Sequence, residues 1–234
     1  MGLRCKACGS AEQVKNGFMG GKQRYRCKGC GLNFTDTPPR GMPLQVKVTA
    51  VLLYVSGLSM NRTAKLLGVS TPSVQAWIEQ FALTHAPKPE PEGRALVIEL
   101  GDVALSEKKT RKLWVWKAWD RASGRLVDWE LGGRDRATLE RLLARVKQKW
   151  NPRLICADDW AAYQEAIPQG QLYVGKEETH GIERDHARQR HWLAPFRRRS
   201  IVVSKAKRMV EAAIALFARF GGNDRMRDLV AMLA

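Results

Sequence analysis

The sequence has no apolar run of about 18 residues, the shortest stretch that is read as a membrane-spanning helix. We therefore expect no segment that spans a bilayer and no membrane among the partners. Acidic residues are also scarce, since 23 Asp and Glu stand against 40 Lys and Arg and give a formal net charge of +17. This excess is spread over both halves of the chain and indicates a polyanionic partner. Nucleic acid is the first candidate, and an anionic membrane surface is the alternative.

The first ten residues, MGLRCKACGS, lack the apolar segment of a secretion signal. We therefore expect a cytoplasmic, nucleoid-associated protein in which cysteines stay reduced. The apolar content of 44% argues against disorder over most of the length.

Cysteine is sparse, with 5 in 234 residues, but four cysteines form two pairs with metal-ligand spacing. Each pair can form a tight knuckle that directs two thiolates to one point, and two knuckles complete a tetrahedral site. The segments QRYRC and GLNFT around the second pair are typical of two hairpin strands. We predict a zinc ribbon over residues 1–38, with a structural Zn²⁺ bound by Cys5, Cys8, Cys27 and Cys30. Two disulfides are the alternative, which the missing secretion signal disfavours.

Residues 44–84 have the apolar spacing of three helices, interrupted at Gly57 and Gly68. A helix, a short turn that contains Gly and a second helix form a helix-turn-helix. We predict that this domain binds double-stranded DNA. Its third helix, TPSVQAWIEQF, would enter the major groove with Ser73 and Gln75 near the bases. The alternative is a three-helix bundle that contacts no DNA.

The segment HAPKPEPEG, residues 85–93, is a Pro-rich, semi-rigid linker. Three strand patterns follow it, and then a helix, a strand and a helix, which together predict a mixed sheet with helices packed on it. This order matches the ribonuclease-H-like layout. We expect an α/β ribonuclease-H-like catalytic domain over residues 94–220 and a C-terminal helix over 221–234. The predicted fold class is therefore multidomain α+β.

Carboxylates follow the fourth strand of this domain and recur on its last helix. In RLICADDW, Asp158 shares a strand face with Cys156, whereas in THGIERDHARQRHW, Glu183 and Arg190 share a helix face. A strand-end Asp and a helix Glu, brought together, can hold a hard divalent cation through oxygen. The alternative is a solvated strand end beside an ordinary charged helix.

The chain resembles a DDE transposase of the insertion-sequence-one family over nearly its whole length. The most specific stretches are QRYRCKGC, KLWVWKAWDRASGRLVDWELGGRDRATL, ADDWAAY, THGIERDHARQRHW and RRRSIVVSK. The resemblance implies a zinc ribbon, a helix-turn-helix and a DDE catalytic domain. It also implies that Asp158 is the second catalytic acid, that Glu183 is the third, and that Arg190 is the basic residue seven positions later.

The first strand departs from the family pattern, which reads ELDE followed by Met-Trp. In this chain the expected Asp falls on Gly101, and Asp102 lies one position later. On a regular strand that offset would put Asp102 on the opposite face. We expect a β-bulge at Gly101 that turns the side chain back. Asp102 is therefore the predicted first acid, in preference to Glu99 and Asp120.

The resemblance implies a DNA transposase that binds the terminal inverted repeats of an insertion sequence and its target DNA. Strand cleavage and strand transfer would use Mg²⁺ or Mn²⁺ held by Asp102, Asp158 and Glu183. We expect a homodimer or a higher oligomer on DNA. One alternative is a DNA-binding regulator with a catalytically inactive nuclease-like domain, and another is a resolvase or repair nuclease of the same fold.

A basic run near the C-terminus is predicted to follow the DNA backbone together with Arg190. Its members are Arg197, Arg198, Arg199 and Lys205. The alternative is a solvated charged surface, since charge runs are common.

Overall fold

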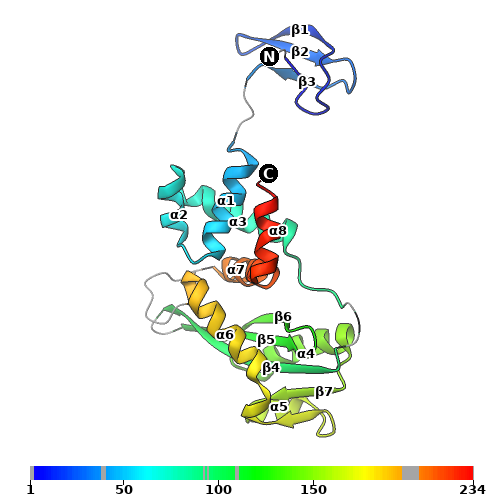
Figure 1. Cartoon of the computed structure of the whole chain (residues 1–234), viewed down its shortest axis with the longest axis vertical. Helices are drawn as coiled ribbons and strands as arrows, with labels where there is room; N and C mark the ends of the chain where they lie inside the picture. Colours follow the sequence, from blue (N-terminus) through cyan, green and yellow to red (C-terminus); the bar gives the residue numbers. More distant parts are fainter. Residues whose placement is uncertain are drawn as a thin grey trace. The chain divides into compact units, whose positions relative to one another are not determined.

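The computed structural model describes residues 3–37, 41–91, 93, 95–108, 111–196 and 206–233. The chain divides into two compact units, Met1–Met42 and Pro43–Ala234 (Figure 1). Within the described ranges, none of the helices combines the length and the apolar composition needed to cross a membrane.

The first unit is a three-stranded antiparallel sheet in the order β1-β2-β3. Its strands are β1 (Gln13–Met19), β2 (Lys22–Cys27) and β3 (Asn33–Thr35). The predicted pairing of QRYRC with GLNFT is confirmed as β2 and β3, whereas β1 was not predicted. The buried core is small and consists of Cys5, Cys27 and Phe34. A core of this size needs a cross-link or a metal to hold it.

The second unit begins with three helices, α1 (Leu44–Val55), α2 (Met60–Leu67) and α3 (Thr71–His85). The side chains of Ser59 and Ser70 cap α2 and α3 by accepting a hydrogen bond from a backbone N–H group of the first turn. Gly68 ends α2 with a φ of 65°, a left-handed conformation that glycine adopts without strain. The three helices therefore form where their sequence pattern predicts them.

A five-stranded mixed sheet follows, in the order β6-β5-β4-β7-β8. The strands are β4 (Val97–Lys108), β5 (Arg111–Asp120), β6 (Arg125–Gly132), β7 (Leu154–Ala157) and β8 (Leu172–Val174). The first three are antiparallel, whereas β7 runs parallel to β4 and β8 parallel to β7. The predicted mixed α+β class is confirmed, although β8 was not predicted.

Helices cover both faces of this sheet (Figure 1). The helices α4 (Arg136–Trp150) and α5 (Ala161–Ala166) enclose one apolar core with the sheet. On the other face, α6 (His180–Trp192) and α7 (Lys207–Phe220) share a second core with α1 to α3 and α8 (Asn223–Ala231). The remaining elements are the short 3₁₀ helices η1 (Lys176–Glu178) and η2 (Ala194–Phe196).

Side chains of β4, the central strand, alternate between these two cores. Leu100 belongs to the core under α4 and α5, whereas Val103 belongs to the core under α6 and α7. Any acid on β4 is therefore assigned to one helical layer or the other by its position in the strand.

Candidate functional site

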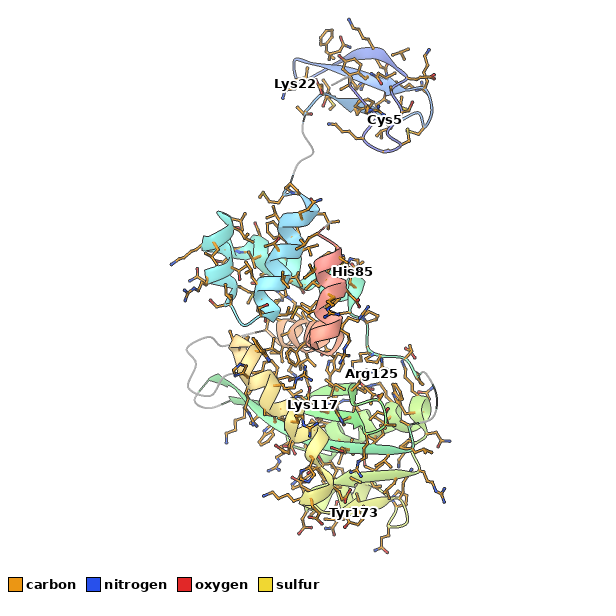
Figure 2. All side chains as sticks on the ribbon, in the orientation of Figure 1. Cys5, Lys22, His85, Lys117, Arg125 and Tyr173 are labelled. Atoms are coloured by element: carbon orange, nitrogen blue, oxygen red, sulfur yellow. The ribbon has the colours of Figure 1, made fainter. Side chains whose placement is uncertain are left out.

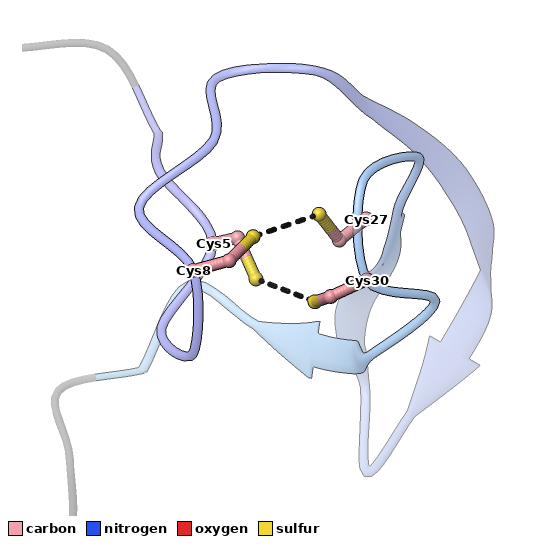
Figure 3. A group of neighbouring side chains, drawn as sticks. All are labelled: Cys5, Cys8, Cys27 and Cys30. Atoms are coloured by element: carbon pink, nitrogen blue, oxygen red, sulfur yellow. Dashed lines mark hydrogen bonds between the residues drawn. The ribbon is translucent and has the colours of Figure 1, made fainter.

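The four paired cysteines of the first unit converge on one point (Figure 3). Their sulfur atoms all lie within 4.8 Å of one another, and the Cys5–Cys30 and Cys8–Cys27 distances are each 3.5 Å. A disulfide would bring two sulfur atoms to about 2.0 Å, and all four cysteines are free. Four sulfur ligands at about 2.3 Å from a tetrahedral zinc ion are about 3.8 Å apart. The cluster therefore fits Zn²⁺.

Backbone hydrogen bonds shape the two knuckles. The N–H of Gly9 donates to the carbonyl of Cys5 at 2.9 Å, and the N–H of Gly31 donates to that of Cys27 at 3.0 Å. These glycines have φ angles of 71° and 74°, a conformation that other residues adopt only with strain. The backbone N–H of Cys8 is the main group that lowers the pKa of Cys5, to about 6. Backbone N–H groups lower the pKa of Cys27 as well, whereas the neighbouring cysteines raise the pKa of Cys8 and Cys30. The thiolate, which is the form that binds zinc, is therefore favoured at Cys5 and Cys27.

In the second unit, Gly101 faces α6. A Cβ atom added there would lie 3.2 Å from Cγ1 of Ile182 and 3.3 Å from Cε1 of His186. The strand keeps a regular register in which Gly101 pairs with Lys117, and the register does not shift before Ser106. The predicted bulge at Gly101 is therefore wrong. The glycine instead permits a close approach of α6 to the sheet.

Because β4 is regular, Asp102 faces the layer of α4 and α5. Its side chain is 4% exposed, and Oδ2 lies 3.3 Å from Nε of Arg134. Burial raises the pKa of Asp102 to about 6, with Arg134 opposing the rise and the negative charges of Asp158 and Glu183 adding to it. The charges of the other two acids thus both act on Asp102. Among the described residues, however, the cysteines alone form a group of three or more ligands within 4.8 Å.

Asp158 follows β7 and offers an oxygen with no partner. Its Oδ1 is buried and accepts no hydrogen bond within the described part of the chain. Buried polar atoms normally have a partner, so an unpaired carboxylate oxygen indicates a ligand such as a water or a cation. This oxygen donor fits a hard cation such as Mg²⁺.

Glu183 lies in the first turn of α6 with its side chain 65% exposed, and Oε1 is 3.7 Å from Nδ1 of His186. The His186 contact lowers the pKa of Glu183, as do the positive charges of Arg190 and Lys117, so this carboxylate is held ionised. Nε2 of His186 is buried and has no partner among the residues that the structure describes. Exposure leaves Glu183 free to turn toward a ligand.

The predicted DNA contacts lie partly within the described ranges. Ser73 and Gln75 are half-buried at the start of α3. Ser73 is engaged in the helix cap, since its hydroxyl is 2.8 Å from that of Ser70. Arg190 is half-buried on α6. The basic run lies outside the described residues, and its members are Arg197, Arg198, Arg199 and Lys205.

The sequence model of the family described as IS1 transposase matches residues 96–220, which extend from the start of β4 to the end of α7 and make up more than half of the chain. The chain belongs to the IS1 transposase family. The match contains all three predicted acids as well as Gly101, Lys117 and Arg134.

Two curated relatives of this IS1-family chain come from Shigella. The InsB protein of insertion element iso-IS1n of Shigella dysenteriae is 28% identical over 124 residues, which cover 53% of this chain and 94% of the relative. The InsB protein of insertion element IS1 of Shigella flexneri is 33% identical over 107 residues, which cover 45% of this chain and 80% of the relative.

Two solved structures are similar at low identity. A chain of the simian T-cell lymphotropic virus intasome in complex with PP2A regulatory subunit B56 gamma matches with a TM-score of 0.40 and 14% identity, covering 76% of this chain and 69% of that one. A chain of the Mos1 mariner paired end complex with Mn matches with a TM-score of 0.41 and 9% identity, covering 85% of this chain and 79% of that one. Likenesses this weak decide neither fold nor function.

Two cations of the IS1-family domain were not predicted from the sequence. Lys117 of β5 is fully buried on the side of the sheet that α6 covers (Figure 2). Its Nζ lies 3.1 Å from Oδ2 of Asp185 and 2.7 Å from Oε1 of Gln189, both on α6. Arg134 pairs with Asp102. The sequence held one signal for Lys117, which is a lysine at an inward position of the alternating strand KLWVWKAWD. No sequence signal indicated Arg134.

Proposed function

We propose that this chain is an insertion-sequence transposase that binds element ends and cleaves and transfers DNA strands in a ribonuclease-H-like domain. Membership of the IS1 transposase family supports the class. The observation that carries the catalytic part is the buried, unpaired Oδ1 of Asp158 at the end of β7. That atom belongs to a carboxylate whose charge influences Asp102, as the charge of Glu183 does.

The three acids have different parts in this proposal. Mg²⁺ or Mn²⁺, when bound, supplies the positive charge that stabilises a phosphoryl transfer. Asp158 contributes its unpaired oxygen, and Glu183 contributes an exposed, ionised carboxylate. Asp102 is the first-strand acid, and its carboxylate must exchange the contact with Arg134 for the cation. Arg190 acts from the same helix as Glu183 and helps to keep that group ionised.

DNA binding is assigned to other parts of the chain. A net charge of +17 favours a polyanion. The helices α1 to α3 act as a helix-turn-helix that reads the terminal repeat, with Ser73 and Gln75 of α3 at the base edges. The zinc ribbon supports end recognition. A homodimer or a larger assembly holds the two ends, at the nucleoid where chromosomal DNA lies. The residues proposed to contact the DNA backbone are Arg190, Arg197, Arg198, Arg199 and Lys205.

A second candidate is a DNA-binding regulator without nuclease activity. Two observations favour it. The space beside Gly101 is filled by Ile182 and His186, and Asp102 is directed to the other face of the sheet, where it already has a partner in Arg134. Such a protein would bind element ends without cutting them.

The two candidates are separated by strand transfer of a labelled element end in Mn²⁺, together with footprinting on the same end. Cleavage that is lost in Asp158→Asn supports the transposase. Asp159→Asn is the matched control, because the neighbouring Asp159 is exposed and accepts a hydrogen bond from Gln164 at 2.8 Å. A clear footprint with no cleavage by the wild-type chain would favour the regulator.

A further inference from the structure

Arg134 lies in the short connection between β6 and α4. The next residue, Asp135, caps α4, and its Oδ1 accepts a hydrogen bond from the N–H of Thr138 at 2.8 Å. This cap fixes the first turn of the helix and therefore the point from which the Arg134 side chain extends.

Two indole rings hold the guanidinium group in place. Its Cζ atom lies 4.7 Å from the ring centroid of Trp114 and 5.3 Å from that of Trp160. Trp160 packs in turn against Trp116, at 5.1 Å between ring centroids, and against Tyr163, at 5.6 Å. Contact with aromatic faces orients a guanidinium without using a hydrogen-bond acceptor.

Among the residues that the structure describes, most of the hydrogen-bond donors of Arg134 have no partner. A guanidinium carries five N–H donors. Nε faces Asp102 at 3.3 Å, and the Arg134 side chain is 39% exposed. Within the described ranges no other carboxylate lies close enough to pair with Arg134, and neither Nη group donates a hydrogen bond. The open side of the guanidinium fork is therefore available to a ligand.

The open side belongs to a groove of about 850 Å³ that also contains Asp158. Lys176 contributes a second cation, whereas Asp159 and Glu177 add negative charge next to Asp158. These carboxylates repel a phosphate, so a DNA strand can enter the groove only if cations offset them. An arginine fork binds the two free oxygens of a phosphodiester with two parallel hydrogen bonds.

We propose that Arg134 binds a backbone phosphate of the DNA strand that is cut beside Asp158. This inference rests on the proposed function, because it assumes that DNA is the substrate of the groove. The contact is made by the Nη groups, and the rings of Trp114 and Trp160 hold the guanidinium ready for it. A purely structural Arg134 would neutralise Asp102 and make no contact with DNA.

The test measures binding of the full-length, zinc-loaded chain to a fluorescent duplex of the element end over a range of salt concentrations. The salt slope is the steepness with which the logarithm of the binding constant falls against the logarithm of the salt concentration. Loss of one phosphate contact lowers this slope by about 1. We expect this loss for Arg134→Met, with weaker binding, and we expect Arg134→Lys to keep the slope but lose affinity because it lacks the fork. Arg136→Met is the matched control, since Arg136 is 53% exposed and is already paired with Glu140.

Arg134→Met leaves Asp102 buried and unpaired, so folding is checked by near-ultraviolet circular dichroism. If the single variant unfolds, the Asp102→Asn/Arg134→Met double variant removes that charge, and its salt slope is compared with that of Asp102→Asn. An unchanged slope in a folded Arg134 variant overturns the inference, whether or not the wild-type chain cleaves DNA. A lowered slope in a chain that never cleaves DNA would preserve the Arg134 contact and reject the catalytic proposal.

Discussion

Lys117 and Asp185 form a buried ion pair that joins α6 to the sheet. Nζ of Lys117 is 3.1 Å from Oδ2 of Asp185, and their side chains are 0% and 5% exposed. Gln189 accepts a hydrogen bond from Lys117 at 2.7 Å and donates one to Asp185 at 2.9 Å. Removal of one partner from such a pair leaves an uncompensated buried charge, which costs about 3–5 kcal/mol.

We therefore expect Lys117→Met to lower the free energy of unfolding by about 3–5 kcal/mol. The Lys117→Met/Asp185→Leu double variant should recover most of this loss, because a well-packed apolar pair often replaces a buried ion pair without a net cost. The control is Arg136→Met, whose exposed pair with Glu140 should contribute little to stability.

The pH dependence of a second variant checks the same network. Burial lowers the pKa of Lys117, and Asp185 opposes that shift. Asp185→Asn removes the negative charge that opposes the shift, so the pKa of Lys117 falls further. Between this lowered pKa and the ordinary lysine pKa of 10.5, the folded chain binds fewer protons than the unfolded chain. Stability must rise with pH wherever the unfolded state binds more protons. The penalty of Asp185→Asn should therefore be largest at low pH and shrink as the pH rises toward 10.5.

Urea unfolding with tryptophan fluorescence measures these effects, because Trp116 and Trp129 are buried in the second unit. The m-value of each variant shows whether unfolding stays comparable with that of the wild-type chain. If Lys117→Met lowers the free energy of unfolding by less than about 1 kcal/mol, which is typical of an exposed ion pair, the network does not anchor α6. A double variant as unstable as Lys117→Met would refute the pairing with Asp185.

Two further predictions concern metal and DNA. Cys27→Ser should reduce bound zinc from one ion per chain to none and unfold the first unit, because binding and folding of small zinc domains are coupled; atomic absorption and NMR measure this, and an intact metal-free ribbon would contradict it. Gln75→Ala should cost about 1–3 kcal/mol in binding to the element end and little on random DNA if Gln75 reads a base; an equal loss on both would limit Gln75 to positioning.

Local patterns were sufficient where local physics decides the structure. Gly68 ends α2 as predicted and Ser59 caps its start, because a side-chain cap and a left-handed glycine act within one helical turn. The alternation of KLWVWKAWD puts Trp116 on one sheet face and Trp119 on the other, as the period of two along a strand requires. The cysteine spacing likewise predicted a cluster that the structure brings together.

Longer-range effects could not be predicted in this way. The partner of Lys117 is 68 residues away in the sequence, and nothing near KLWVWKAWD indicates an acid opposite the lysine. The bulge at Gly101 failed as a prediction for the same reason. A glycine in a strand permits either a bulge or a close neighbour, and the choice depends on Ile182 and His186 of α6.

The offset of one residue between Gly101 and Asp102 decides which helical layer a first-strand acid faces. An acid at position 101 would project toward α6 and toward Lys117, whose ammonium group is fully buried and unavailable to DNA. Asp102 projects instead toward Arg134, a cation that is 39% exposed beside the Asp158 groove. The two cations thus have separate roles. The buried Lys117 holds α6 in place, and the exposed Arg134 binds the DNA strand. Catalysis through Asp102 would therefore require the DNA strand to enter at the Arg134 groove and not between the sheet and α6.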